Sequence, residues 1–302
     1  RRRWCARSLG RHSDLQGQAL SGAQSKAQAF LSSQREGRVD WARNVFVRNA
    51  KLYQLVLEGM WERGEEDAVA ISSYLAEEGL KGCRVIDVPC GIGRVAVPLA
   101  RLGFEVTGVD LSPHLISVAE KKAAQFKVAS GMARFLVGDM RDLSERLEPG
   151  GFDVALNVFT SIGYGLEEDD LRFFREARAM TRPGGLLLIS GLRNRDYIAR
   201  NPSQNVYEES KKLLVLDTYS FDSARSREKG LWRFYLKRGE KGGEALKFAG
   251  EFPVDIRVYA PHELVPRLEA TGWRVKGTYE SFTTKSPFKA DSPVYALVAT
   301  AV

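Results

Sequence analysis

The stretch Val85–Arg94, which reads V-I-D-V-P-C-G-I-G-R, decides the fold. It opens with a short apolar run that ends in an acid, Asp87, and continues into a bend that carries Gly91 and Gly93. An apolar run, a glycine bend and then a helical stripe of apolar residues predict a buried strand, a tight loop and a helix. The helix is expected at 93–102, with a proline distorting its first turns.

The same alternation of strand and helix continues along the chain. Short apolar strands that alternate with helices predict a parallel sheet covered on both faces. Right-handed crossovers then bring the carboxyl ends of the strands to one edge, where ligands bind. The expected strands are 84–87, 105–110, 133–137, 152–158 and 186–190, and the expected helices between them are 93–102, 113–126 and 167–180.

Sequence on both sides of this core has its own pattern. Helices are expected at 41–62 and 65–78 before the core. Segments 211–219, 231–238 and 246–258 alternate in the manner of strands, which predicts a small antiparallel β insertion at about 203–258. A helix at 261–270 and strands at 273–282 and 294–300 should close the fold as a hairpin. We therefore expect a tail at 1–40 and one domain at 41–302, with its core at 80–200 and its last helix and hairpin at 259–302.

The positive charge is concentrated at one end of the chain. The chain has 302 residues and a net charge of +7, and its first fifty residues hold ten Lys and Arg but three acids. The body is therefore neutral, which argues against a nucleic-acid partner. The first forty residues are rich in Ser, Gln and Gly, so we expect a disordered basic tail. A transit-like segment and a nucleic-acid arm are the alternatives.

Other classes of protein are excluded by composition. No stretch approaches the roughly 20 apolar residues of a membrane span, so we expect no membrane association. Three widely spaced cysteines without a C-x-x-C pair argue against a disulfide framework and favour a reducing, cytoplasmic location. The three histidines form no metal or triad pattern, so no metal site is predicted.

Three acids should line one edge of the sheet. Asp87, Asp110 and Asp139 end or directly follow the first three strands, so their carboxylates should share the ligand-binding rim. G-x-G-x-x-A at 91–96, with Asp110 placed 19 residues after Gly91, matches the dinucleotide fingerprint.

Charge distinguishes the two kinds of cofactor that use such a bend. A diphosphate near Asp87 would place like charges about 4 Å apart, which costs roughly 4 kcal/mol at an effective dielectric constant of 20. S-adenosylmethionine (SAM) carries a sulfonium and an ammonium instead, and both favour a nearby carboxylate. The acids therefore favour SAM over a dinucleotide.

At these residues the chain resembles the class I SAM-dependent methyltransferases. The first motif has the D-x-P-C-G-x-G-R form of a bacterial and archaeal subgroup, with Pro89 where a glycine is usual. The resemblance implies a Rossmann-like α/β fold, a seven-stranded mostly parallel sheet of order 3-2-1-4-5-7-6 with strand seven antiparallel. The motifs that carry it are Val85–Arg94, Val106–Ser112, Gly138–Met140, Phe152–Tyr164 and Arg182–Gly185.

The resemblance also implies roles for single residues. Asp110 would bind the ribose hydroxyls, Asp139 the adenine amino group and Asp87 the methionine amine or the loop backbone. Arg94 would pair with the methionine carboxylate, or else form a surface or inter-helix salt bridge. The expected cofactor-binding residues are Asp87, Pro89, Cys90, Gly91, Gly93, Arg94, Asp110, Leu111, Asp139, Met140 and Asn157.

These observations predict a methyltransferase that uses SAM, releases S-adenosylhomocysteine and acts on a small-molecule acceptor by in-line displacement. Phe159, Ser161 and Tyr164 are the candidates for the acceptor pocket, and no catalytic residue is identified. An NAD(P)-linked oxidoreductase and a non-catalytic SAM-binding protein are the alternatives. The acceptor and the oligomeric state are not encoded in any pattern that we recognise.

Overall fold

The computed structural model describes residues 40–302 except 160, 202–203 and 241–242. Side chains 204–206, 239–240 and 243–244 are also left out of the description. The predicted basic tail therefore lies outside the described residues, apart from its last position. Residues 42–302 form one compact unit, and this unit contains every element discussed below.

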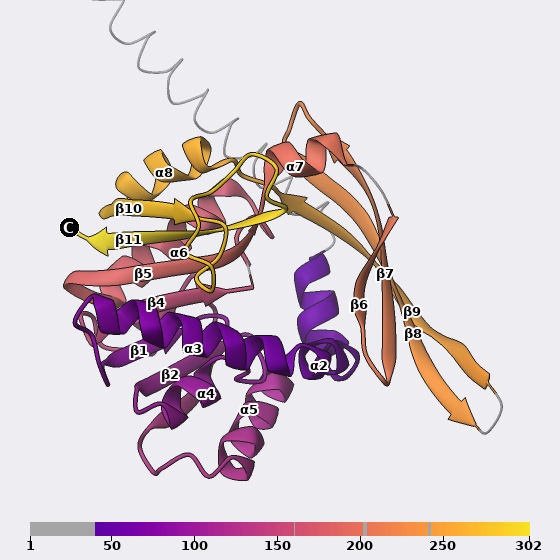
Figure 1. The fold of residues 1–302 in the computed structure, drawn as a ribbon, viewed down its shortest axis with the longest axis horizontal. Helices are drawn as coiled ribbons and strands as arrows, with labels where there is room; N and C mark the ends of the chain where they lie inside the picture. Colours follow the sequence, from indigo (N-terminus) through magenta and orange to yellow (C-terminus); the bar gives the residue numbers. More distant parts are fainter. Residues whose placement is uncertain (1–39, 160, 202–203, 241–242) are drawn as a thin grey trace, which may run out of the picture. The chain divides into compact units, whose positions relative to one another are not determined.

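The centre of this unit is a seven-stranded sheet of order β10-β11-β5-β4-β1-β2-β3 (Figure 1). The first five strands along the chain are parallel, and β11 is antiparallel to both β5 and β10. The predicted order and the closing hairpin are therefore confirmed. The strands are β1 (Arg84–Asp87), β2 (Glu105–Asp110), β3 (Ala133–Val137), β4 (Phe152–Val158), β5 (Thr181–Arg193), β10 (Trp273–Tyr279) and β11 (Val294–Ala301).

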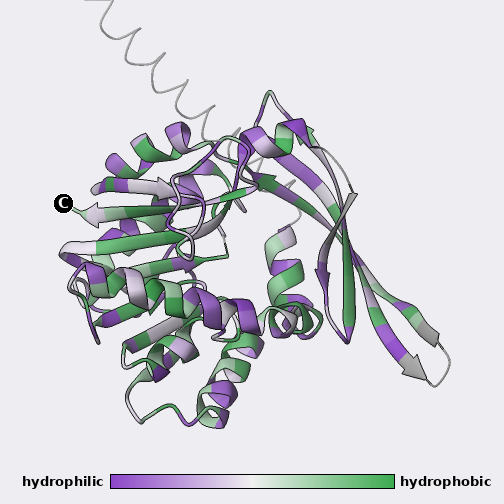
Figure 2. Cartoon of the chain, viewed as in Figure 1, coloured by the Kyte–Doolittle hydropathy of each residue, from purple (hydrophilic) through white to green (hydrophobic). Residues whose placement is uncertain are grey.

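Helices flank the sheet, and its central strands are predominantly apolar (Figure 2). Two buried hydrophobic clusters fill the space between the sheet and its helices, as expected for a parallel sheet covered on both sides. The flanking helices are α3 (Trp61–Glu77), α4 (Ala96–Arg101), α5 (Pro113–Gln125), α6 (Glu167–Met180) and α8 (Pro261–Glu269), with short helices η2 (Leu143–Glu145) and α7 (Arg195–Arg200) in connections.

The N-terminal helix predicted at 41–62 is in fact three pieces. A π-helical turn, η1 (Arg43–Arg48), is followed by α2 (Ala50–Gly59) and then by α3. Asn49 causes the first break, because both its backbone N–H and its Nδ2 donate to the carbonyl of Asn44, at 3.0 and 2.9 Å. An Asn side chain that competes for backbone groups in this way interrupts a regular helix.

The helix predicted from residue 93 begins later, at Ala96. The bend before it holds Gly93 at φ +75°, which a helix cannot accommodate. Pro98 falls in the first turn of α4, where backbone N–H groups lack an intrahelical partner, so its missing donor costs little there. The late start of α4 therefore follows from the glycine bend and not from the predicted distortion by Pro98.

The insertion is a second sheet of four antiparallel strands, order β6-β7-β8-β9. Its strands are β6 (Gln204–Glu209), β7 (Leu213–Asp222), β8 (Arg227–Glu240) and β9 (Gly243–Arg257), and β6 was not predicted. In Figure 1 this sheet stands beyond the carboxyl ends of β1, β4 and β5, with α2 next to it.

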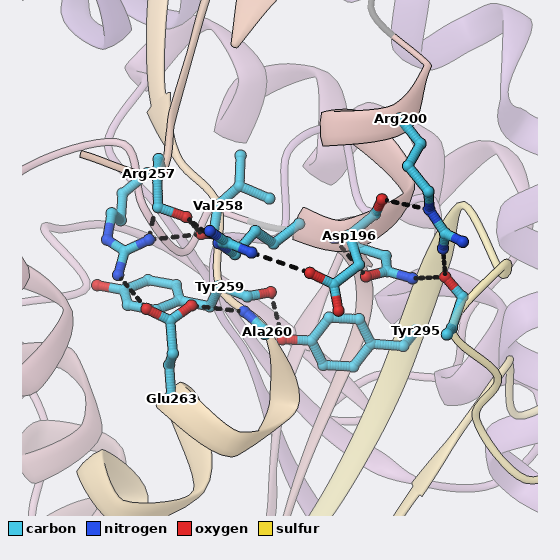
Figure 3. A network of polar contacts seen from close by, with 12 residues as sticks. Asp196, Arg200, Arg257, Val258, Tyr259, Ala260, Glu263 and Tyr295 are labelled. Atoms are coloured by element: carbon cyan, nitrogen blue, oxygen red, sulfur yellow. Dashed lines mark hydrogen bonds and ion pairs between the residues drawn. The ribbon is translucent and has the colours of Figure 1, made fainter. Parts of the chain in front are cut away.

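A polar network joins the end of the insertion to α8 (Figure 3). Arg257 donates to the carbonyl of Val258 at 2.6 Å and to Glu263 at 2.6 Å. Glu263 in turn accepts the backbone N–H of Ala260 at 2.9 Å, which caps α8. Tyr295 of β11 donates to the carbonyl of Tyr259 at 3.1 Å. The network therefore fixes β9 against the closing hairpin of the main sheet.

None of the helices in the described part of the chain combines the length and the apolar character needed to cross a membrane.

Candidate cofactor and acceptor site

Asp110 anchors the glycine bend to the end of β2. Its Oδ2 accepts the backbone N–H of Gly91 at 2.9 Å, and its Oδ1 accepts that of Ser112 at 2.9 Å. Burial raises the pKa of Asp110 to about 6, although the two N–H donors oppose this. Each carboxylate oxygen thus uses one acceptor position on the backbone and keeps further capacity for hydroxyl donors.

Asp87 ends the neighbouring strand β1 and is a buried acid with which no described residue pairs directly. It is 2% exposed and forms no hydrogen bond or ion pair with any described residue. Burial raises its pKa to about 7; the charge of Asp110 adds to this and that of Arg94 opposes it. An unpaired buried carboxylate is costly unless a positive group is bound beside it.

The bend between these acids depends on glycine. Gly91 and Gly93 have φ values of +55° and +75°, in the left-handed region that other residues avoid. A Cβ at Gly93 would also lie 3.0 Å from Val97 and 3.3 Å from Ala119. The backbone therefore turns tightly here and presents the loop to the edge of the sheet.

The other predicted residues of this loop have structural contacts. The Sγ of Cys90 is 3.7 Å from the carbonyl of Gly91, and the side chain is 4% exposed. Burial raises the pKa of the Cys90 thiol well above its usual value, so the thiol is not a reactive thiolate. Pro89, in a cis peptide bond after Val88, and Leu111, which follows Asp110, are half-buried.

Asp139 is paired within the protein. Arg141 donates to it from Nε at 2.9 Å and from Nη2 at 2.7 Å, and its Nη1 reaches Asp169 at 2.8 Å. Although burial opposes the shift, these hydrogen bonds hold the pKa of Asp139 below its usual range. The carboxylate expected to contact adenine is therefore ionised and held in place by a bidentate arginine.

Asn157 and its neighbours tie the end of β4 to the end of β1. The Nδ2 of Asn157, fully buried, donates to the carbonyl of Val88 at 2.7 Å and to the Oγ of Ser161 at 2.8 Å. Ser161 Oγ lies 3.3 Å from the Sδ of Met140. Asn157 and Ser161, the residues predicted to face the cofactor and the acceptor, are held in place by this internal network.

Arg94 has the internal partner that the sequence left open. Its Nη1 lies 3.2 Å from Asp67 of α3, and its guanidinium lies 4.9 Å from the centroid of the Phe159 ring. Phe159, at the end of β4, has φ +69°, which is unusual for a residue with a side chain. Backbone strain of this kind gathers at functional sites.

Aromatic rings from three parts of the chain meet beyond β4. Tyr164 stacks on Phe46 of η1 at 5.4 Å, and Phe46 meets Tyr53 of α2 edge to face at 4.6 Å. Tyr207 of β6 lies 6.5 Å from Phe159, and its hydroxyl acts electrostatically on that of Tyr53. Tyr164 and Phe159 are thus brought together with rings of the N-terminal helices and of the insertion.

Tyr207 and the buried acid Asp170 were not predicted as functional. Asp170 of α6 accepts the backbone N–H of Gly163 at 2.9 Å and the hydroxyl of Tyr259 at 2.7 Å, and so holds the loop after β4. No spacing in the sequence signals either residue, because the bond from Tyr259 to Asp170 and the ring contact of Tyr207 with Phe159 join elements far apart in the sequence. Among the described residues, no group of three His, Cys, Asp or Glu side chains could hold a metal ion.

Several known proteins that resemble part or most of this chain are methyltransferases. A family model described as a methyltransferase domain matches residues 85–185. A ubiquinone biosynthesis O-methyltransferase of Xanthomonas campestris is 33% identical over 124 residues, 41% of this chain and 49% of that protein. Its counterpart in Cereibacter sphaeroides is 36% identical over 124 residues, 40% of this chain and 45% of that protein. The chain spans less than half the length of these relatives.

Solved structures share the fold at low identity. The CcbJ methyltransferase of Streptomyces caelestis has a TM-score of 0.63 and 22% identity, over 79% of this chain and 89% of its own. CalS10 of Micromonospora echinaspora, an amino pentose methyltransferase with SAM bound, has a TM-score of 0.62 and 18% identity, over 83% and 96%. Residues 85–185 therefore match a methyltransferase domain, and the chain has the Rossmann-like fold of the class I methyltransferases.

Proposed function

We propose that this chain binds SAM at the carboxyl edge of β1, β2 and β3 and transfers its methyl group to a small-molecule acceptor, leaving S-adenosylhomocysteine. The observation that carries the proposal is Asp87, a buried acid with a pKa raised to about 7 and no hydrogen-bond or ion-pair partner among the described residues. A cationic cofactor would supply the missing positive charge, whereas a diphosphate would add a second negative one.

The other residues proposed to contact the cofactor lie at the same edge of the sheet. Asp110, with acceptor capacity left on both oxygens, would bind the ribose hydroxyls, and Asp139 would accept the adenine amino group beside Met140. The glycine bend would approach the methionine part of the cofactor. Arg94 is satisfied by Asp67, so we assign it to the support of the site rather than to the methionine carboxylate.

Methyl transfer from SAM requires little acid–base catalysis by the protein. The sulfonium already activates the methyl group, so the acceptor atom attacks the methyl carbon as the carbon–sulfur bond breaks and its electrons pass to sulfur. The chain then has to align the three atoms and exclude water. Phe159 and Tyr164 from the core, with Tyr53 and Tyr207 from α2 and β6, would line the acceptor side.

The insertion and the N-terminal helices would thus cover the acceptor. The functions of similar proteins, in ubiquinone biosynthesis and on an amino pentose, support a small molecule in this position. An NAD(P)-linked oxidoreductase is the runner-up on the glycine bend alone, and the unpaired Asp87 argues against it.

Calorimetry tests the proposal. The full chain should bind SAM and S-adenosylhomocysteine and leave NADH unbound. Asp110→Ala should weaken SAM binding about 30-fold or more, because it removes charge-assisted hydrogen bonds to the ribose. Glu105→Ala, an exposed acid at the opposite end of β2 from Asp110, should bind as the parent does. Absence of SAM binding, or an Asp110→Ala variant with parental affinity, would contradict the proposal.

Catalysis needs a separate measurement, because a non-catalytic SAM-binding protein would pass the binding test. The chain should transfer label from methyl-labelled SAM to at least one component of a metabolite extract. Binding without transfer to any component would reduce the function to cofactor binding.

A further inference from the structure

Two buried acids and a half-buried arginine lie together where the insertion meets the end of β5. Arg193, the last residue of β5, hydrogen-bonds Glu228 of β8 and lies 3.5 Å from Asp217 of β7. Glu228 is 0% exposed and Asp217 is 1% exposed, while the Arg193 side chain is 23% exposed. Two buried acids therefore share a single guanidinium.

This cluster lacks one positive charge. Among the described residues, Arg193 is the cation whose charge acts on both carboxyl groups. Burial raises the pKa of Glu228 to about 7 and raises that of Asp217, although Arg193 lowers both. The Oε2 of Glu228 is buried and has no hydrogen-bond partner among the described residues. Leaving such an oxygen unpaired costs folding free energy, which suggests that it serves a ligand.

Aromatic rings lie next to the cluster on the side of the methyltransferase core. Trp232 stands opposite Asp217 in the register of β7 and β8, and it stacks on Tyr207 at 4.6 Å. Tyr207 lies 6.5 Å from Phe159 at the end of β4, and the charge of Arg193 acts on it. The negative face of an aromatic ring attracts cations, most strongly in a dry environment.

We propose that the acceptor carries a protonated amine, and that this ammonium binds against the rings of Tyr207 and Trp232 beside Asp217 and Glu228. The inference rests on the proposed methyl transfer and names its acceptor class. The ammonium supplies the positive charge that the cluster lacks. It also supplies a donor for the unpaired Oε2 of Glu228.

The charge of the ligand is the property to test. The full chain, saturated with S-adenosylhomocysteine, is titrated by calorimetry at about pH 7 with cyclohexylamine, cyclohexanol and cyclohexanecarboxylate, which have similar shape. Cyclohexylamine should bind at least about tenfold more tightly than the other two, because only the ammonium gains the charge pairing and the ring contact. Equal binding of the three probes, or no binding of the amine, would overturn the inference.

Variants locate the effect. Glu228→Gln should weaken cyclohexylamine binding at least about tenfold and leave the affinity for S-adenosylhomocysteine unchanged. Asp217→Asn should do the same, and it keeps the test valid if Glu228→Gln fails to fold. Glu251→Gln on β9 is the matched control, because its side chain is 52% exposed and pairs with Arg233 away from the cluster.

The outcomes separate the two proposals. If the parent chain does not bind S-adenosylhomocysteine, the proposed function fails. If it binds S-adenosylhomocysteine but Glu228→Gln and Asp217→Asn bind the amine like the parent, only the amine inference fails, and the cluster is an anchor between the insertion and β5.

Discussion

Replacing Asp87 by Asn should stabilise the ligand-free protein and weaken its binding of the cofactor. On folding, burial moves the pKa of Asp87 from 3.8 to about 7. Each pH unit of such a shift is worth about 1.4 kcal/mol, so ionised Asp87 costs up to about 4 kcal/mol of unfolding free energy above pH 7. Asn has nearly the same shape and no charge to bury, so the variant escapes this cost.

The sign of the pH dependence follows from linkage. Between its unfolded and folded pKa values, Asp87 holds a proton in the folded chain and has lost it in the unfolded chain, so parental stability falls as pH rises through this window. The stability advantage of Asp87→Asn should therefore grow by about 2 to 3 kcal/mol from about pH 5 to about pH 8. Urea unfolding of both chains, without ligand, measures this difference.

Cofactor binding should change in the opposite direction. SAM needs Asp87 ionised, so parental affinity should fall about tenfold for each pH unit below about 7. Asp87→Asn should bind SAM about 10 to 100-fold more weakly at about pH 8 and lose this pH dependence. A variant that matches the parent in both its unfolding profile and its SAM affinity would refute our interpretation of Asp87.

Asp153 supplies the matched control at the opposite end of a neighbouring strand. Hydrogen bonds from Arg182, at 2.5 Å, and from the backbone of Arg84 hold the pKa of Asp153 below its usual range, against the effect of burial. Its contribution to stability is present above its unfolded pKa and is lost as pH falls through the folded one. Asp153→Asn should therefore destabilise the chain at neutral pH, with SAM affinity unchanged.

Two further substitutions test the loop after β4. Gly163→Ala should lower the unfolding free energy by about 3 kcal/mol or more, because the new Cβ would lie 2.0 Å from the carbonyl oxygen of Arg257 and the residue has a φ of +89°. Gly150→Ala is the control: its φ is +69° but its Cβ would meet open space, so it should cost about 1 to 2 kcal/mol. Equal losses of stability in thermal unfolding of the two variants would contradict this geometry. Tyr259→Phe removes the hydroxyl that donates to buried Asp170 and should lower the unfolding free energy by about 1 to 3 kcal/mol. The loss should be larger at about pH 8 than at about pH 6, because this donor stabilises the ionised form of Asp170. Urea unfolding that shows no such pH trend would count against the contact.

The main sheet could be predicted from the sequence because its strands are short, apolar and separated by helical periods. Val85–Asp87 and Glu105–Asp110 both end in acids, and parallel topology alone puts Asp87 and Asp110 at one edge. The break in the N-terminal helix was not predictable from periodicity, since the apolar spacing continues through Asn49. It arises from a side chain that bonds the backbone of Asn44.

The candidate site was predictable only where its residues follow strands. Asp139 stands where the motif places it, but its pairing with Arg141 depends on a side-chain choice that no spacing dictates. The bond from Arg193 to Glu228 joins residues 35 positions apart and depends on how the insertion packs against β5. Long-range contacts of this kind are set by tertiary packing, and local sequence patterns carry no record of them.

The cofactor end and the acceptor end of the proposed site share one electrostatic property: each contains a buried acid with a raised pKa. The cofactor end holds Asp87 and the acceptor end holds Glu228, and burial raises the pKa of each to about 7. Both acids destabilise the empty chain at neutral pH, and a bound cation relieves that cost at either end. A sulfonium and an ammonium would then stabilise the fold separately, and the two gains should add, because Asp87 and Glu228 have no shared partner among the charges that act on them. Thermal unfolding with each ligand alone and with both would show this additivity. A second ligand that gave no added stabilisation would mean that both cations compete for one end of the site.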